Sequence, residues 1–298
     1  MTRILLSSLL LSTLFVAPLL AAESSARPPV SPFGFGHRYR LGADMDGGGE
    51  VSSHSSYVQL GARIYAGQSN RISLSGSYQR SAYDLSNGSP GSFSSLDPWG
   101  DVHAIQLSLP IQWDLPGEWS FFGVPSVRFA GEDGAGIGDS LSGGLIAGAS
   151  YRLSDRLTLG PGIGFISQIE DDVSIFPLVY VKWRFTDTLT LTTVPTSAGL
   201  FAPGLALNWQ ISDEWQFTFG ARYEKLRFRL DDGGVAEDRT IPVYGSLTYQ
   251  ATDHWRVTFL GGIGLANELL LEDHSGRRLR KSDADPAPFI GLSAAVYF

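Results

Sequence analysis

The chain of 298 residues contains no cysteine and carries no basic surplus. Without cysteine, disulfide frameworks, thiolate metal sites and cysteine nucleophiles are excluded. The formal net charge of −8 argues against a nucleic-acid partner, because phosphate binding requires a basic face. After residue 22 no apolar run reaches the ~18 residues of a membrane-spanning helix, so any membrane passage must use strands.

The N-terminus has the pattern of an export signal. Arg3 supplies a positive charge, an apolar run extends from Ile4 to Leu20, and Ala21-Ala22 offers small residues for cleavage. An uncleaved anchor is the alternative, but Pro18 interrupts the run. The sequence therefore predicts a signal peptide at 1–22, a short periplasmic segment at 23–36 and one outer-membrane domain at 37–298.

From residue 37 onward, apolar and polar residues alternate with period two, the pattern of strands with one apolar face. The segments are about ten residues long, which suits a tilted strand crossing a bilayer. An all-β fold is predicted, a closed antiparallel transmembrane β-barrel of about 14 strands, or 12 if the weak segment at 188–196 and its partner are lost. The expected strands are 37–45, 56–66, 71–83, 102–114, 119–130, 141–153, 156–168, 173–186, 188–196, 202–211, 214–229, 240–251, 254–267 and 287–298.

The connections alternate between short and long, as in barrels with tight periplasmic turns and long outer loops. The long ones are expected at 84–101, 131–140, 230–239 and 268–286. Four short turns share a Ser/Thr-Asp pair, as in Ser212-Asp213 and Thr252-Asp253. Asp in such a turn is expected to accept a hydrogen bond from the backbone two residues on.

Six of the seven tryptophans lie within a few residues of a short turn, on the apolar side of their strands. Amphipathic rings favour the membrane–water interface, so they predict an outward-facing aromatic girdle. These residues are Trp113, Trp119, Trp183, Trp209, Trp215 and Trp255. A β-sandwich core would instead scatter tryptophans along its strands.

The last ten residues, Phe289 to Phe298, place apolar side chains at alternate positions and end on phenylalanine. This resembles the C-terminal signal that the barrel-assembly machinery reads in Gram-negative outer-membrane β-barrel proteins, although Val296 stands where an aromatic residue is more usual. The resemblance to this porin-like class covers the whole mature chain. It implies an outer-membrane location, contact with outer-membrane lipids and lipopolysaccharide, and Phe298 as the assembly signal.

If the apolar side faces lipid, the other side faces the lumen, and basic residues dominate it. The acidic candidates are only Asp44, Asp114 and Glu224, against basic candidates that include Arg38 and Arg71. A ring of like charge sets ion selectivity in a pore. The predicted selectivity residues are Arg40, Arg63, Arg128, Arg152, Lys182, Arg184, Arg222 and Arg256. Pairing of these residues with carboxylates is the competing interpretation.

Two further features bear on the lumen. Ile166, Phe176, Leu178 and Tyr180 also fall on the inward side, where they would line an apolar slot or lie under an infolded loop. The alternation shifts after Tyr223, so the strand at 214–229 is expected to leave the bilayer by Lys225 or to contain a bulge.

The function predicted from these features is passive diffusion of small solutes through an outer-membrane channel, with a preference for anions. A structural, adhesion or ligand-binding barrel with a blocked lumen is the first alternative. A lipid-modifying enzyme is the second alternative, because His54-Ser55-Ser56 matches a His-x-Ser motif in which the histidine would activate the serine. However, His54 is expected in a Ser-rich loop, and no third polar residue that would orient the histidine can be assigned. Neither a cofactor nor a metal site is predicted, and the sequence does not indicate an oligomeric state.

Overall fold

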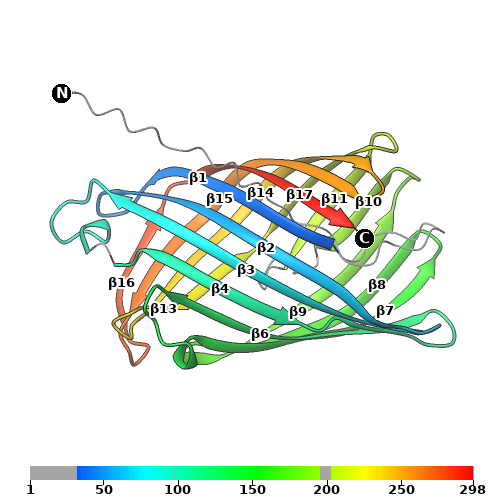
Figure 1. Cartoon of the computed structure of the whole chain (residues 1–298), viewed down its shortest axis with the longest axis horizontal. Helices are drawn as coiled ribbons and strands as arrows, with labels where there is room; N and C mark the ends of the chain where they lie inside the picture. Colours follow the sequence, from blue (N-terminus) through cyan, green and yellow to red (C-terminus); the bar gives the residue numbers. More distant parts are fainter. Residues whose placement is uncertain (1–31, 97, 195–202, 298) are drawn as a thin grey trace.

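The computed structural model describes residues 32–96, 98–194 and 203–297, which form one antiparallel sheet closed on itself (Figure 1). Closure is made by the two ends of the chain. β1 (Pro32–Asp44) pairs with β17 (Ala287–Tyr297) along nine residue pairs, from Pro32 opposite Tyr297 to Arg40 opposite Phe289. β1 also pairs with β2 (Glu50–Ala66), and each later strand adds to the next. Among the described residues, none of the helices is both long and apolar enough to span a membrane.

The remaining strands follow in chain order around the wall. They are β3 (Asn70–Ser86), β4 (Asp101–Ser108), β5 (Ile111–Asp114), β6 (Trp119–Glu132), β7 (Leu141–Ser154), β8 (Leu157–Gln168), β9 (Asp171–Arg184), β10 (Leu189–Val194), β11 (Gly204–Gln210), β12 (Trp215–Arg222), β13 (Glu224–Arg229), β14 (Val235–Thr252), β15 (Trp255–Glu272) and β16 (Arg278–Ala284). Two short 3-10 helices, η1 (Ser94–Leu96) and η2 (Gly138–Ser140), lie in the connections.

Three strands of the wall are interrupted, so the seventeen labelled segments make 14 strands. β4 and β5 both lie between β3 and β6, β12 and β13 both pair with β14, and β16 and β17 both pair with β15. Pro110 and Pro286 fall in two of the breaks, where a residue without an N–H cannot continue the ladder. The prediction of about 14 strands is confirmed over the alternative of 12.

The wall extends further than the sequence indicated. β1 begins at Pro32, inside the segment predicted to precede the barrel. The loops predicted at 230–239 and 268–286 are wrong, because β14 begins at Val235, β15 continues to Glu272 and β16 follows. Their charged composition is typical of loops, but here the charges pair across strands, as in Arg239 with Glu268 at 2.9 Å.

The short turns are held by hydroxyl groups. Thr252 Oγ1 accepts hydrogen bonds from the backbone N–H of His254 and Trp255, and Ser212 Oγ accepts one from Trp215. The other two turns that share the Ser/Thr-Asp pair use Ser154 and Thr186 in the same way. The expectation that Asp caps these turns is therefore wrong. A hydroxyl at the first position competes for the same N–H groups.

The outer face of the wall is apolar. On β12 the residues Trp215, Phe217 and Phe219 alternate with polar neighbours and are between 36% and 53% exposed. All six predicted girdle tryptophans are exposed and lie near short turns, at the same end of the barrel. Side chains of this kind left uncovered around a closed sheet indicate a surface that faces lipid.

A packed core fills the opposite end of the barrel. β13 and the first part of β14 form a hairpin that leans across the mouth until Arg229 of β13 reaches Gly131 of β6 in a single parallel bridge. Phe228 of this hairpin is fully buried against Tyr83 and Trp99. The shift of alternation after Tyr223 is the point where the strand leaves the cylindrical wall, as the sequence predicted.

Candidate functional site: the barrel lumen

The luminal face of each strand is fixed by register. Arg38 and Arg40 of β1 lie opposite Ser55 and Ser53 of β2, which in turn lie opposite Ser81 and Tyr83 of β3. Alternate residues on these strands, such as Tyr39 and Leu60, are exposed on the outer face. The wall formed by β1, β2 and β3 is therefore polar on the inside and apolar on the outside.

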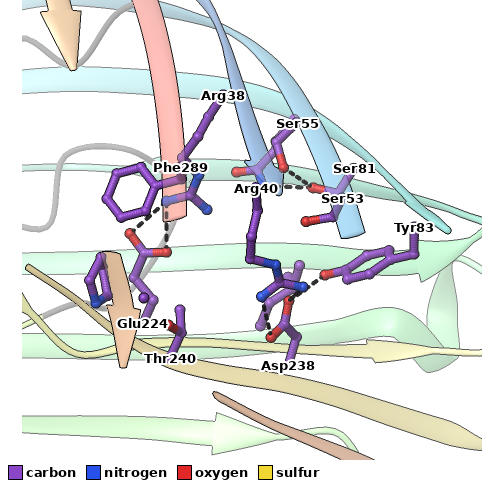
Figure 2. A pocket seen from close by; sticks show the side chains of 14 residues that line it. Arg38, Arg40, Ser53, Ser55, Ser81, Tyr83, Glu224, Asp238, Thr240 and Phe289 are labelled. Atoms are coloured by element: carbon purple, nitrogen blue, oxygen red, sulfur yellow. Dashed lines mark hydrogen bonds and ion pairs between the residues drawn. The ribbon is translucent and has the colours of Figure 1, made fainter. Parts of the chain in front are cut away.

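An ion-pair network links this polar wall to the β13–β14 hairpin across the lumen (Figure 2). Arg38 Nη1 lies 3.0 Å from Glu224 Oε2, and Glu224 Oε1 also accepts a hydrogen bond from Arg222. Arg40 Nη2 lies 3.1 Å from Asp238 Oδ2. The Tyr83 hydroxyl donates to the same oxygen of Asp238 at 2.9 Å. Charged hydrogen bonds of this kind are about twice as strong as neutral ones, so they hold the hairpin to the opposite wall.

Little space remains within the network. The cavity lined by Arg38, Arg40, Tyr83, Glu224 and Asp238 has a volume of about 30 Å³. A water molecule needs roughly 10–15 Å³ of such space, so the cavity has room for about two waters. Directly beyond it lies the apolar core around Phe228. On this side, the outer end of the lumen is closed to solutes.

The predicted lumen residues all occupy inward-facing positions on their strands, but they divide into two groups. One group has carboxylate partners within 4 Å: Arg38, Arg40, Arg71, Arg152 and Arg222. The partner of Arg40 is Asp238, which the sequence had placed in an outer loop. For these five arginines, the competing interpretation, pairing with carboxylates, is the one that the structure shows.

The second group forms no ion pair with any described residue. Its members are Arg63, Arg128, Lys182, Arg184 and Arg256. Four of them lie near the end of the barrel that carries the short turns, where Arg256 donates hydrogen bonds to Tyr297 and Gln250. Arg128 lies deeper and is only 5% exposed. Among the described residues, the luminal carboxylates therefore leave part of the positive charge of the lumen without an ion-pair partner.

The opposite wall, formed by β6 to β9, carries an apolar strip on the inside between its basic residues. Phe122 packs against Tyr180 with ring centroids 5.9 Å apart, and Leu178 lies opposite Gly162. A Cβ at Gly164 would collide with the ring of Phe176, so glycine there makes room for the aromatic side chain. The predicted apolar slot exists, and the β13–β14 hairpin covers part of it.

The structure changes the setting of His54 and Ser56. Both lie on the outer face of β2 and not in a loop, because the Ser-rich stretch continues the ladder with β1 and β3. The histidine that contacts Ser56 is His37 of β1, with Nδ1 and Oγ 3.0 Å apart. No carboxylate bonds to His37 or His54 among the described residues. The arrangement lacks the third member that would orient a catalytic base.

The predicted assembly signal, Phe298, lies outside the described residues. Its strand neighbours in β17 pair with both β1 and β15. Its role stays a prediction.

Comparison with solved structures agrees with this architecture. An outer membrane channel from Pseudomonas putida F1 superposes with a TM-score of 0.54 at 12% identity, over 93% of this chain and 99% of that chain. The chain has the fold of a bacterial outer-membrane β-barrel. A Pseudomonas aeruginosa FadL homologue gives a TM-score of 0.49 at 12% identity, over 91% of each chain. No protein-family model matches the barrel, and no curated protein matches it.

Sequence reasoning missed the residues that close the mouth. Asp238, Glu237 and Phe228 were assigned to a loop or to a strand that leaves the bilayer. A signal was present, because Phe228 and Leu230 alternate with Arg227 and Arg229 after the parity shift. Alternation that continues with the opposite phase indicates a strand that turns one face toward a new environment.

Proposed function

We propose that this protein is an outer-membrane channel through which small solutes diffuse passively, with a preference for anions. The observation that carries the proposal is the set of basic side chains inside a closed barrel that form no ion pair within the described parts of the chain. A lumen with fixed positive charge attracts anions and repels cations.

The arrangement of the outer mouth favours a narrow channel over a wide pore. The β13–β14 hairpin crosses the lumen and is held by the ion pairs of Arg38 and Arg40. We take the pocket on the side of β6 to β9 as the route for solutes, so small molecules are the expected cargo. Outer-membrane lipids and lipopolysaccharide around the apolar surface, and assembly by the barrel machinery, remain expectations from the same architecture.

The test is single-channel recording of the refolded mature protein in a planar bilayer, with a potassium chloride gradient across it. Wild type is expected to show steady openings and a reversal potential that favours chloride. A variant with Arg63, Lys182, Arg184 and Arg256 each changed to Gln is expected to lose most of that preference, because the unpaired charges at one mouth are gone.

The matched control removes four exposed charges toward the outer end of the barrel, with Arg80, Arg277, Arg278 and Arg280 changed to Gln. Arg80 is exposed on the outer face, Arg277 is exposed in the turn before β16, and Arg278 and Arg280 are exposed at the beginning of β16. These side chains lie away from the mouth that the first variant neutralises, so the reversal potential should stay close to that of wild type. An electrically silent barrel would refute the channel. A cation preference in wild type, or equal shifts in both variants, would refute the anion preference.

A second candidate, lipid hydrolysis by His54 and Ser56, gains no support from the contacts of these residues. We therefore expect no enzymatic activity.

A further inference from the structure

A second pocket lies between the apolar wall and the outer face of β13. Its volume is about 260 Å³, much larger than the cavity within the ion-pair network. Ile166, Phe176 and Pro177 line one side, and Tyr223, Lys225 and Arg227 line the other. It continues the apolar strip inside β6 to β9 toward the outer end of the barrel. A solute that follows the strip would reach this pocket.

The buried guanidinium of Arg128 faces this pocket. It is on the inward face of β6, opposite Gln106 of β4 and Ser142 of β7, and it lines the cavity. Its Nε and Nη2 atoms are buried and make no hydrogen bond to any residue in the described parts of the chain. Burying a guanidinium without a partner is costly, so this side chain requires an acceptor that the described chain does not supply.

The other two cations on the pocket wall are already neutralised. Lys225 Nζ lies 3.0 Å from Glu237 Oε2, and Arg227 bonds to both Glu237 and Glu272. Glu237 is fully buried between them. The charge left over in this pocket is therefore the single positive charge of Arg128, which calls for one negative charge on a ligand.

We infer that this pocket binds a small amphipathic carboxylate, with its carboxylate on Arg128 and its apolar body against Ile166 and Phe176. The inference rests on the proposed channel, since it names the class of solute that the same lumen takes. Arg can donate two parallel hydrogen bonds to a carboxylate, and the apolar lining accepts a body without polar groups.

The size of the pocket limits the ligand. Pockets for drug-sized molecules measure roughly 300–1,000 Å³, so a cavity of about 260 Å³ suits a smaller molecule. A benzene ring that carries one carboxylate fits both the volume and the charge. Benzoate is the natural probe, and benzamide has nearly the same shape without the charge.

The experiment is equilibrium dialysis of radiolabelled benzoate and benzamide against the refolded mature protein in nonionic detergent, corrected with empty micelles. Wild type should bind benzoate saturably and benzamide at least about tenfold more weakly, the factor expected for a charged hydrogen bond. Arg128→Met should weaken benzoate binding by about tenfold or more and leave benzamide binding unchanged.

Arg71→Met is the matched control, because Arg71 is also a luminal arginine but pairs with Asp114 and does not line this pocket. It should bind benzoate as wild type does. Equal benzoate binding in wild type and Arg128→Met, equal binding of the two ligands, or no saturable binding would each overturn the inference. Chloride-selective openings without benzoate binding would refute only the pocket. Benzoate binding in a silent barrel would refute only the channel.

Discussion

Arg40 and Arg128 are both buried arginines on the luminal face, but their partners differ. Arg40 has Asp238 as a counter-ion, and Arg128 has none among the described residues. A buried ion pair contributes little compared with an apolar pair, yet removing one member leaves an uncompensated charge. The same residue type is therefore a structural link at one position and a candidate binding group at the other.

The Arg40–Asp238 pair gives a prediction at this scale. Asp238→Asn should lower the free energy of unfolding by about 3–5 kcal/mol, because Arg40 loses its counter-ion in a site with little water. Urea unfolding of the protein in lipid vesicles measures this change. Asp101→Asn is the control, since its partner Arg80 is half exposed and surface pairs contribute less than about 1 kcal/mol.

A combined variant separates the charge from the packing. Arg40→Met, Tyr83→Phe and Asp238→Leu together remove the whole polar group, so most of the lost stability should return. If Asp238→Asn and Asp101→Asn cost the same, the luminal pair does not hold the hairpin in the way described.

At the scale of elements, the β13–β14 hairpin determines the shape of the outer mouth. Its inward face supplies Leu226 and Phe228 to the core, and its other face supplies Lys225 and Arg227 to the larger pocket. Each face of the hairpin lies against a different part of the barrel wall. The hairpin thus divides the outer half of the lumen into a closed side and a side with space.

Shortening the hairpin should open the closed side. Replacing residues 225–239 with Asn-Gly joins Glu224 to Thr240, which are already paired, through a two-residue turn. We expect single-channel conductance to rise severalfold, because the apolar core and Asp238 are removed from the mouth. Replacing 67–70 with Asn-Gly is the control, since that turn joins the paired residues Ala66 and Arg71 at the other end of the barrel. Equal conductance in both variants and wild type would show that the hairpin is not the constriction.

At the scale of the whole molecule, the barrel could be predicted and the mouth could not. Period-two alternation and the tryptophans near short turns depend only on which side of a strand meets lipid, so they are visible in each strand alone. The contacts of Arg40 with Asp238, and of Phe228 with Trp99, join residues far apart in sequence. Charged strands such as β16 are typical of loops until their partners across the ladder are known. The parity of the luminal residues could be predicted, but not which of them are paired.

Closure of the barrel rests on the seam between β1 and β17, and the absence of native cysteine makes this seam testable. Gly36 lies opposite Ser293 with both on the inward face. Directly opposed residues are about 4.5–5.5 Å apart between Cα atoms, within the 4.4–6.8 Å that a disulfide spans. Gly36→Cys with Ser293→Cys should therefore form an intramolecular disulfide on oxidation, detected by faster migration of the unfolded protein on a non-reducing gel.

Gly36→Cys with Gly291→Cys is the matched control. Position 291 is on the same face but lies opposite Arg38, so the pair is displaced by two residues along the strand. Such diagonal positions are about 7–8 Å apart, beyond the reach of a disulfide without movement of the backbone. A disulfide in the first pair alone supports both closure and register. Equal crosslinking of both pairs would mean that the seam slides, and none in either would mean that the sheet is open at β1.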